Sequence, residues 1–587
     1  LSASTGSGQL SGTVDFDQGT FSGSLGGNNV SGSACQIAGM FGAGSVDFDD
    51  QVDEEIALRD VIVNADNGLQ FEGDRSDRDE NDGAQGRNFQ EDFFDFIDEN
   101  GSFANNAAPN GRDRVDVINI SPQINPLTLA ASAGGSGLIN NPVQAPEGAH
   151  NWIGAVDPTA PDPDGDPSNA GPFWDGWTYV NVNTKPNGLP VVEGSLPLSD
   201  AADTAGGTSA DGIFHPLEDD IRDGTLAPAS SPNCPQFSTA AGTATIFGTD
   251  FPVCEINQQI TSDVTLTNDQ VYVLTDTINV GDGGQAGGPS GNNNATLTVE
   301  GGTQLYAEDG TTSLGGVQAS LVITRGSEIE TQPSSTPASA DLPIITQAVE
   351  FDVDGNGNVN DDPADLSGRG LWGGVVLNGF GVDNECNDPD ENDEVGTEAV
   401  PTGAERFFGC DDNGDSSGNL SFVIIAESGL PFRPDEEVQG LTVEAAGSGT
   451  TIDHIQVLGS EDDGIEFFGG AASASNLVIN GVEDDGLDFD SGYGGRTGNN
   501  VDPAVSGAVI QTAIIRQGPT KGDKGSEADT EGASDDAEPV TRPDLVNVTF
   551  LGNNGSPGNT TRGLNWRRGM GGTLWRSVIT DDTASVK

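Results

Sequence analysis

Two similar blocks of sequence stand 22 residues apart in the second half of the chain. The first copy, HIQVLGSEDDGIEFFGG, starts at His454, and the second, NLVINGVEDDGLDFDSG, starts at Asn476. Each copy contains a short alternating apolar segment, an acidic turn and a second short apolar segment, and this alternation is the period of a β-strand. A repeated strand–turn–strand unit of this length is typical of a solenoid in which each coil packs on the next.

The strand pattern continues on both sides of the duplicated block, with longer insertions. First strands are also predicted at 421–429, 512–518, 545–552 and 576–582, and second strands at 440–447, 525–529 and 563–569. Upstream, DVTLTNDQVYVL, ATLTVEGGTQLYA, ASLVITRGSEIE and GLWGGVVLNGF read as earlier turns of the same coil. The predicted fold is all-β, a right-handed parallel β-helix over residues 259–587. A sandwich or propeller would need hairpin turn signals that do not repeat here.

The chain before the coil divides into two regions. Residues 1–149 are predicted to form a β-rich cap or accessory region with one short helix within 86–101, and we expect this region to cover the first turn. Residues 150–258 form a Pro- and Asp-rich connecting region. Its tryptophans are either a sugar-stacking platform or anchors that hold a long loop to a domain face, and we favour anchors: Trp152, Trp174 and Trp177.

The charge of the chain restricts its partners. The 587 residues carry a net charge of −71, which repels nucleic acid and anionic membranes. No apolar run reaches the ~18 residues of a membrane-spanning helix. The chain opens with LSASTGSGQL, which has no signal-peptide pattern and fits a mature form whose leader has been removed.

The cysteines favour an oxidising compartment. Of the five, we predict that two local pairs form disulfides, Cys234 with Cys254 and Cys386 with Cys410, which leaves Cys35 unpaired. Neither pair has metal-ligand spacing, although spacing alone does not fix the connectivity. Disulfides imply an extracellular or outer cell surface location.

Stacking of the repeat determines where the acidic residues lie. Matched residues in successive turns of a parallel β-helix are about 4.8 Å apart, so Glu466 should lie over Asp488. Glu527 and Asn565 extend this column in the same register. The acidic turns should stack in the same way, placing Asp462 and Asp463 over Asp484 and Asp485. Two carboxylates at this distance repel by roughly 3–4 kcal/mol at an effective dielectric constant of about 20.

A hard cation would relieve this repulsion. We predict a structural Ca²⁺, because calcium takes several carboxylate and carbonyl oxygens as ligands. The predicted ligands are Asp462, Asp463, Glu466, Asp484, Asp485 and Asp488. Solvation of flexible turns, protonation of the carboxylates and a catalytic acid/base cluster are the alternatives.

A second candidate metal site lies in FDVDGNGNVNDDP. Oxygen-bearing side chains alternate there, as in an EF-hand or dockerin loop, at Asp352, Asp354, Asn356 and Asn358. Pro363 stands where such a loop has its bidentate acid, so Asp361 or Asp362 would have to replace that ligand.

Several motifs carry a family resemblance. GLWGGVVLNGFGV, EVQGLTVEAAGSGTTIDHIQVLGSEDDGIEFFGG, NLVINGVEDDGLDFDSGYGG and GLNWRRG resemble a family of large secreted or surface β-helix proteins of marine and other Gram-negative bacteria. The resemblance covers roughly residues 150–587. It implies the β-helix fold and a surface location, and no established activity.

The function predicted is an extracellular, calcium-stabilised surface protein with a structural, adhesive or filament- or coat-forming role. Self-association and a glycan are the candidate partners. A polysaccharide lyase or glycoside hydrolase on the same scaffold is the first alternative; Arg567 and Arg568 are nominal bases for a lyase. A surface binding protein that serves nutrient uptake is the second alternative.

Overall fold

The computed structural model describes most of the chain from residue 213 onward, with gaps. The main described ranges are 213–283, 294–308, 319–332, 342–349, 369–384, 412–431, 438–494, 508–517, 522–530, 539–552, 562–566 and 570–580. Short segments elsewhere are also described, among them 56–64, 115–119, 154–156, 173–174, 177–181 and 584–586. The predicted helix within 86–101 lies outside the described residues.

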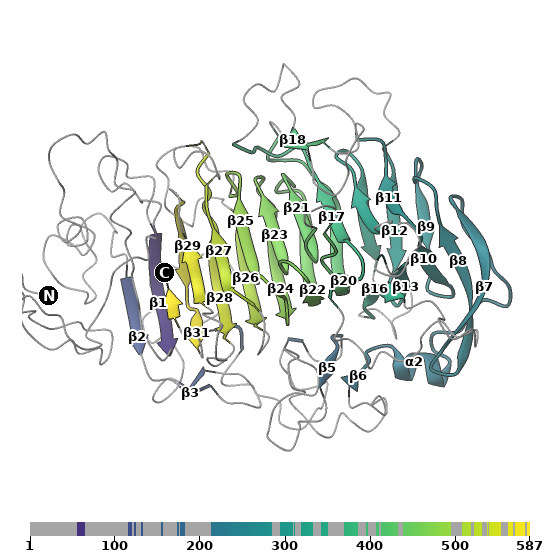
Figure 1. Ribbon diagram of the computed structural model, residues 1–587, viewed down its shortest axis with the longest axis horizontal. Helices are drawn as coiled ribbons and strands as arrows, with labels where there is room; N and C mark the ends of the chain where they lie inside the picture. The colour runs from purple at the N-terminus through teal and green to yellow at the C-terminus, as the bar shows by residue number, and fades with distance from the viewer. Residues whose placement is uncertain are drawn as a thin grey trace, which may run out of the picture.

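The described strands wind into a parallel β-helix, which confirms the predicted fold class (Figure 1). One ladder along the coil includes all the predicted second strands and extends beyond them at both ends. It contains β11 (Thr277–Val280), β14 (Ser320–Ile323), β17 (Gly374–Asn378), β21 (Leu441–Glu444), β23 (Ile465–Phe468), β25 (Leu487–Asp490), β27 (Lys524–Ala528), β29 (Arg562–Trp566) and β32 (Ala584–Val586).

Two further ladders form the rest of the wall. In the early turns they are separate: β9 (Val264–Leu266), β12 (Thr296–Glu300) and β15 (Glu328–Gln332) in one, and β10 (Val271–Leu274), β13 (Gln304–Glu308) and β16 (Ile344–Val349) in the other. From the middle of the coil they merge into single long strands, namely β20 (Gly418–Ser428), β22 (Thr451–Ser460), β24 (Ser473–Asn480), β26 (Val509–Arg516) and β28 (Asp544–Leu551). At the last turn they separate again into β30 (Gly572–Trp575) and β31 (Val578–Thr580).

Each long strand bends at one matched position, and the last turn bends at the corresponding residue between β30 and β31. At matched positions in successive turns the backbone enters the left-handed region, with φ between 46° and 57° at Phe422, His454, Asn476, Thr512, Asn547 and Arg576. Asparagine tolerates this conformation, whereas most side chains pay a steric cost of about 1–2 kcal/mol. The stacked bends divide each long strand into two sides of the coil, so that each turn has three sides in all. The alternating pattern of a strand in the sequence does not show where such a bend lies.

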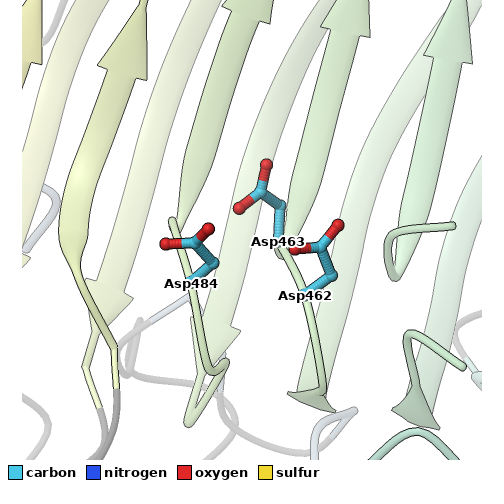
Figure 2. A group of neighbouring side chains, drawn as sticks. All are labelled: Asp462, Asp463 and Asp484. Atoms are coloured by element: carbon cyan, nitrogen blue, oxygen red, sulfur yellow. The ribbon is translucent and has the colours of Figure 1, made fainter. Parts of the chain in front are cut away.

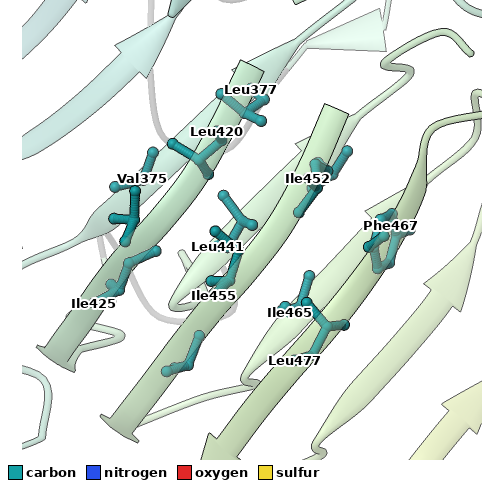
Figure 3. Packing of buried hydrophobic residues seen from close by; sticks show 14 of the residues in the cluster. Val375, Leu377, Leu420, Ile425, Leu441, Ile452, Ile455, Ile465, Phe467 and Leu477 are labelled. Carbon is teal, nitrogen blue, oxygen red and sulfur yellow. The ribbon is translucent and has the colours of Figure 1, made fainter. Parts of the chain in front are cut away.

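The core lies inside the coil and follows the predicted register. Ile455 pairs with Leu477 and Ile465 with Leu487 across neighbouring turns, 22 positions apart. Phe467 stacks on Phe489 with ring centroids 5.4 Å apart. Buried aliphatic and aromatic side chains therefore form continuous rows along the axis (Figure 3).

An antiparallel hairpin begins the coil. It consists of β7 (Ser238–Ile246) and β8 (Thr249–Ile256), and β8 pairs in parallel with β10 of the first turn. The predicted disulfide between Cys234 and Cys254 is confirmed and ties the hairpin to the segment before it, with Cα atoms 5.4 Å apart. Cys386 and Cys410 lie outside the described residues.

The N-terminal region contributes strands to the opposite end from the one we expected. β1 (Ile56–Asn64) pairs in parallel with β30 and β31 of the last turn, and β2 (Val115–Asn119) pairs with β1. Figure 1 shows both strands beside the C-terminal turns. The first turn is instead covered by the β7–β8 hairpin, because a local hairpin closes that edge at little loop-closure cost.

The connecting region runs back along the outside of the coil. Gly154 N–H donates to Arg576 O near the last turn, at 2.6 Å. Trp177 lies edge-on against Phe422 in the middle of the coil, and α2 (Glu218–Asp223) lies near the first turn. Trp174 and Trp177 are 0% and 4% exposed, so they anchor this region to the coil and do not form an exposed sugar-stacking platform. Trp152 lies outside the described residues.

A buried hydrogen-bond chain joins the connecting region to the coil. The Leu217 N–H donates to Nδ1 of His215 at 3.3 Å, so the neutral ring carries its proton on Nε2. Nε2 and the Tyr179 hydroxyl are 3.0 Å apart, and that hydroxyl donates to Gln347 Oε1 on β16 at 2.9 Å. Burial lowers the pKa of His215 from about 6.5 to about 3.

We expect His215 to make the fold sensitive to acid. The folded state keeps the ring neutral while the unfolded chain binds a proton below about pH 6.5, so this contribution is complete above that pH and is lost on acidification towards about pH 3. Acidification should therefore destabilise wild type more than His215→Gln. Between about pH 7 and pH 4, the free energy of unfolding of wild type should fall by about 1–3 kcal/mol more than that of the variant. Urea unfolding of both proteins across this range measures the difference. If the free energies of unfolding of the two proteins change equally with pH, His215 is not the source of the acid sensitivity.

Candidate functional site: an acidic ladder

The predicted acidic column runs along the outer face of the ladder that contains β23, β25 and β27. Alternation points Ile465 and Phe467 into the core and Glu466 outward. Glu466 pairs with Asp488, as the sequence predicts. The register continues through Leu487 and Ser526, and Glu527 pairs with Asn565 one turn further.

The acidic turns stack directly below this column. Asp463 Oδ1 accepts a hydrogen bond from the Asp485 backbone N–H at 2.7 Å, which links the two turns. Figure 2 shows Asp462 and Asp463 on one turn and Asp484 on the next. Asp463 and Asp485 are only 5% and 2% exposed.

The glycine of each acidic turn is required by close packing. A Cβ on Gly464 would lie 2.4 Å from Ile479 Cγ2 and 2.6 Å from the Gly486 carbonyl oxygen of the next turn. Any larger residue would push the turns apart, so the repeated Asp-Asp-Gly sequence places the carboxylates where adjacent coils are closest.

The structure brings all six predicted ligands of this site together. Their carboxylate oxygens fall into three groups, each within 4.8 Å: Asp462, Asp463 and Asp484; Asp463, Glu466 and Asp488; and Asp484, Asp485 and Asp523. Because the groups share Asp463 and Asp484, the carboxylates form one continuous array. We call the acidic ladder the set Asp462, Asp463, Glu466, Asp484, Asp485, Asp488, Asp523 and Glu527.

Lys524 enters the ladder from the start of β27. Its Nζ lies 3.1 Å from Asp485 Oδ2 and 2.9 Å from Asp523 Oδ2, and it also contacts Glu527 Oε2. The Lys524 backbone N–H donates to Asp485 Oδ1 at 2.8 Å. One ammonium group is therefore enclosed by three carboxylates.

The electrostatic environment opposes ionisation of the acids. Burial, followed by the charges of neighbouring carboxylates, raises the pKa values of Asp463 and Asp485 well above the ordinary carboxyl range. Burial and then the charge of Glu527 raise the pKa of Asp488 to about 8. Burial alone would lower the pKa of Lys524, but Asp485 and Glu527 raise it above its ordinary value. A ladder with these properties either retains protons or binds cations.

Some residues of this region escaped the sequence analysis. Lys524 and Asp523 lie just before a strand that the repeat does predict, but an insertion hides their match to Asp485 and Asp484. Asp490 lies beside Asp529, which directly follows β27, and burial and then the charge of Asp529 raise the pKa of Asp490 to about 9. Extending the Glu466 register two residues along each strand would have found this pair.

The second candidate metal site, Asp352, Asp354, Asn356 and Asn358, lies outside the described residues, as do Arg567 and Arg568.

The fold and the site define a parallel β-helix protein with a partly buried acidic ladder on one outer face. A family model described as a pectate-lyase like beta helix domain matches residues 258–587. The match covers more than half of the chain, so the protein belongs to this family. Neither the curated proteins nor the solved structures contain a match. In the described part of the chain, no helix has the length and apolar character needed to cross a membrane.

Proposed function

We propose that the protein is an extracellular β-helical surface protein stabilised by Ca²⁺ bound at the acidic ladder. The observation that carries this proposal is the array of three overlapping groups of carboxylates, with the oxygens of each group within 4.8 Å of one another. Three members of the array are almost fully buried, namely Asp463, Glu466 and Asp485. Hard oxygen ligands at this density suit calcium, which takes six to eight of them. The group of Asp463, Glu466 and Asp488 is the proposed centre, because it spans two adjacent turns and a bound ion would join them.

Calcium is expected to raise the thermal stability of the protein, and a chelator to lower it. At free Ca²⁺ about 100-fold above its Kd, an ion that binds only the folded state adds about 2.7 kcal/mol to the free energy of unfolding. Thermal unfolding followed by circular dichroism in calcium and in chelator measures this gain.

The matched control for this experiment is Asp250→Asn. Asp250 is an exposed acid in the β7–β8 hairpin, and Asn can still accept the hydrogen bond from Thr245. This variant should respond to calcium as wild type does. Identical melting curves of wild type in calcium and in chelator would overturn the proposal.

The role of such a protein is structural or adhesive, and the exposed outer strand of the hairpin at the first turn supports self-association into a filament or layer. Among the described strands β7 pairs only with β8, and its residues 239–243 are exposed and uncharged. An edge strand without charges is a surface on which another strand can pair. Sedimentation velocity over a range of concentrations tests this role, and a single monomeric species throughout would exclude it.

A polysaccharide lyase is the second candidate, because the family is described as pectate-lyase like. Carboxylates on neighbouring turns could hold the cation that binds an acidic sugar, whereas the strong negative charge of the chain opposes that substrate. Incubation with pectin and alginate in the presence of calcium tests this candidate. Ultraviolet absorbance of an unsaturated product would establish the lyase, and intact polymer would exclude these substrates.

A further inference from the structure

We propose that Lys524 is the resident cation at one end of the acidic ladder, and that it limits the number of divalent ions the ladder takes up. The inference rests on the proposed function, and it adds the residue that sets the stoichiometry of that site. In wild type a divalent ion would bind at Asp463, Glu466 and Asp488, while Lys524 fills the next position along the axis.

The observation that points to a cation position is the ammonium group already there. Lys524 Nζ contacts carboxylates from two successive turns, Asp485 from one and Asp523 and Glu527 from the other. Its side chain is 8% exposed, so the protein and not the solvent supplies its oxygen partners. The backbone N–H of Lys524 also donates a hydrogen bond to Asp485 Oδ1, which orients the carboxylate towards Nζ.

The ion pairs of Lys524 lie in one part of the ladder, and the carboxylates grouped around Asp463 lie in another. Asp463 is grouped with four other carboxylates, those of Asp462, Glu466, Asp484 and Asp488. All three ion pairs of Lys524 are made in the other part of the ladder. A cation binding near Asp463 therefore does not have to displace the ammonium group.

Removal of the ammonium charge should convert its position into a second ion site. Asp485, Asp523 and Glu527 would retain three carboxylates around a space left by Nζ. Calcium–oxygen distances of about 2.3–2.6 Å are shorter than the contacts of Nζ with Asp485 and Asp523, so small shifts of these two side chains would suffice. Methionine at this position keeps the length of the side chain and removes the charge.

Calcium titration calorimetry of the full chain tests the inference. Lys524→Met should bind one more Ca²⁺ per chain than wild type, whereas Lys524→Arg, which keeps the charge, should bind the same number as wild type. Lys524→Gln serves as a second uncharged variant. A chain with either uncharged residue that unfolds without calcium and folds with it would also support the inference.

The possible failures are distinguishable. Wild type that binds no calcium overturns the proposed function, and a gain of one ion in Lys524→Met would then still support the assignment of Lys524. Wild type that binds calcium while both uncharged variants bind the same number overturns the inference alone. Uncharged variants that stay unfolded in calcium overturn it as well.

Discussion

Phe467→Ala is expected to lower the free energy of unfolding by about 3–5 kcal/mol. Phe467 is fully buried and stacks on Phe489, and its ring centroid lies 4.7 Å from that of Tyr493. Truncation leaves a cavity between two turns, and the neighbouring rings cannot close it because their own strands fix their spacing. Denaturant unfolding followed by tryptophan fluorescence measures the loss.

Phe468→Ala is the matched control, because Phe468 follows on the same strand and faces outward, only half-buried. Its loss should be clearly smaller than that of Phe467→Ala. Equal losses for the two variants would show that the axial row of rings does not hold the turns together.

Asp463→Asn is expected to raise the free energy of unfolding in the absence of calcium by about 1–3 kcal/mol, and to remove most of the calcium response. The amide oxygen can still accept the hydrogen bond from Asp485 N–H, so the turn is preserved. The substitution removes a charge that repels four neighbouring carboxylates. The repulsion in each such pair is up to roughly 3–4 kcal/mol, and screening by salt and proton uptake reduce it.

The same calcium and chelator series on wild type, Asp463→Asn and Asp250→Asn measures both effects. Destabilisation of Asp463→Asn in chelator would show that its carboxylate contributes net stability without a metal ion. An undiminished calcium response would place the ion elsewhere in the chain.

The repeat made much of the site predictable. Because Ile465 matches Leu487 at a fixed step of 22 residues, parallel pairing places Glu466 on Asp488. The same argument correctly added Glu527 and Asn565, which the repeat places in the same column. It could not add Lys524, since the insertion between β25 and β27 interrupts the period before that residue.

The sequence by itself determined the parallel coil, its register and the column of acids, because these follow from side-chain alternation and a short period that act between neighbouring turns. Only the tertiary structure decided that β1 joins the last turn, that the Trp177 segment covers the outer wall, and that Lys524 enters the ladder. These contacts join residues that no periodicity relates. These contacts depend on how insertions and distant segments pack on the coil. Burial of apolar side chains and pairing of opposite charges determine which residues meet there.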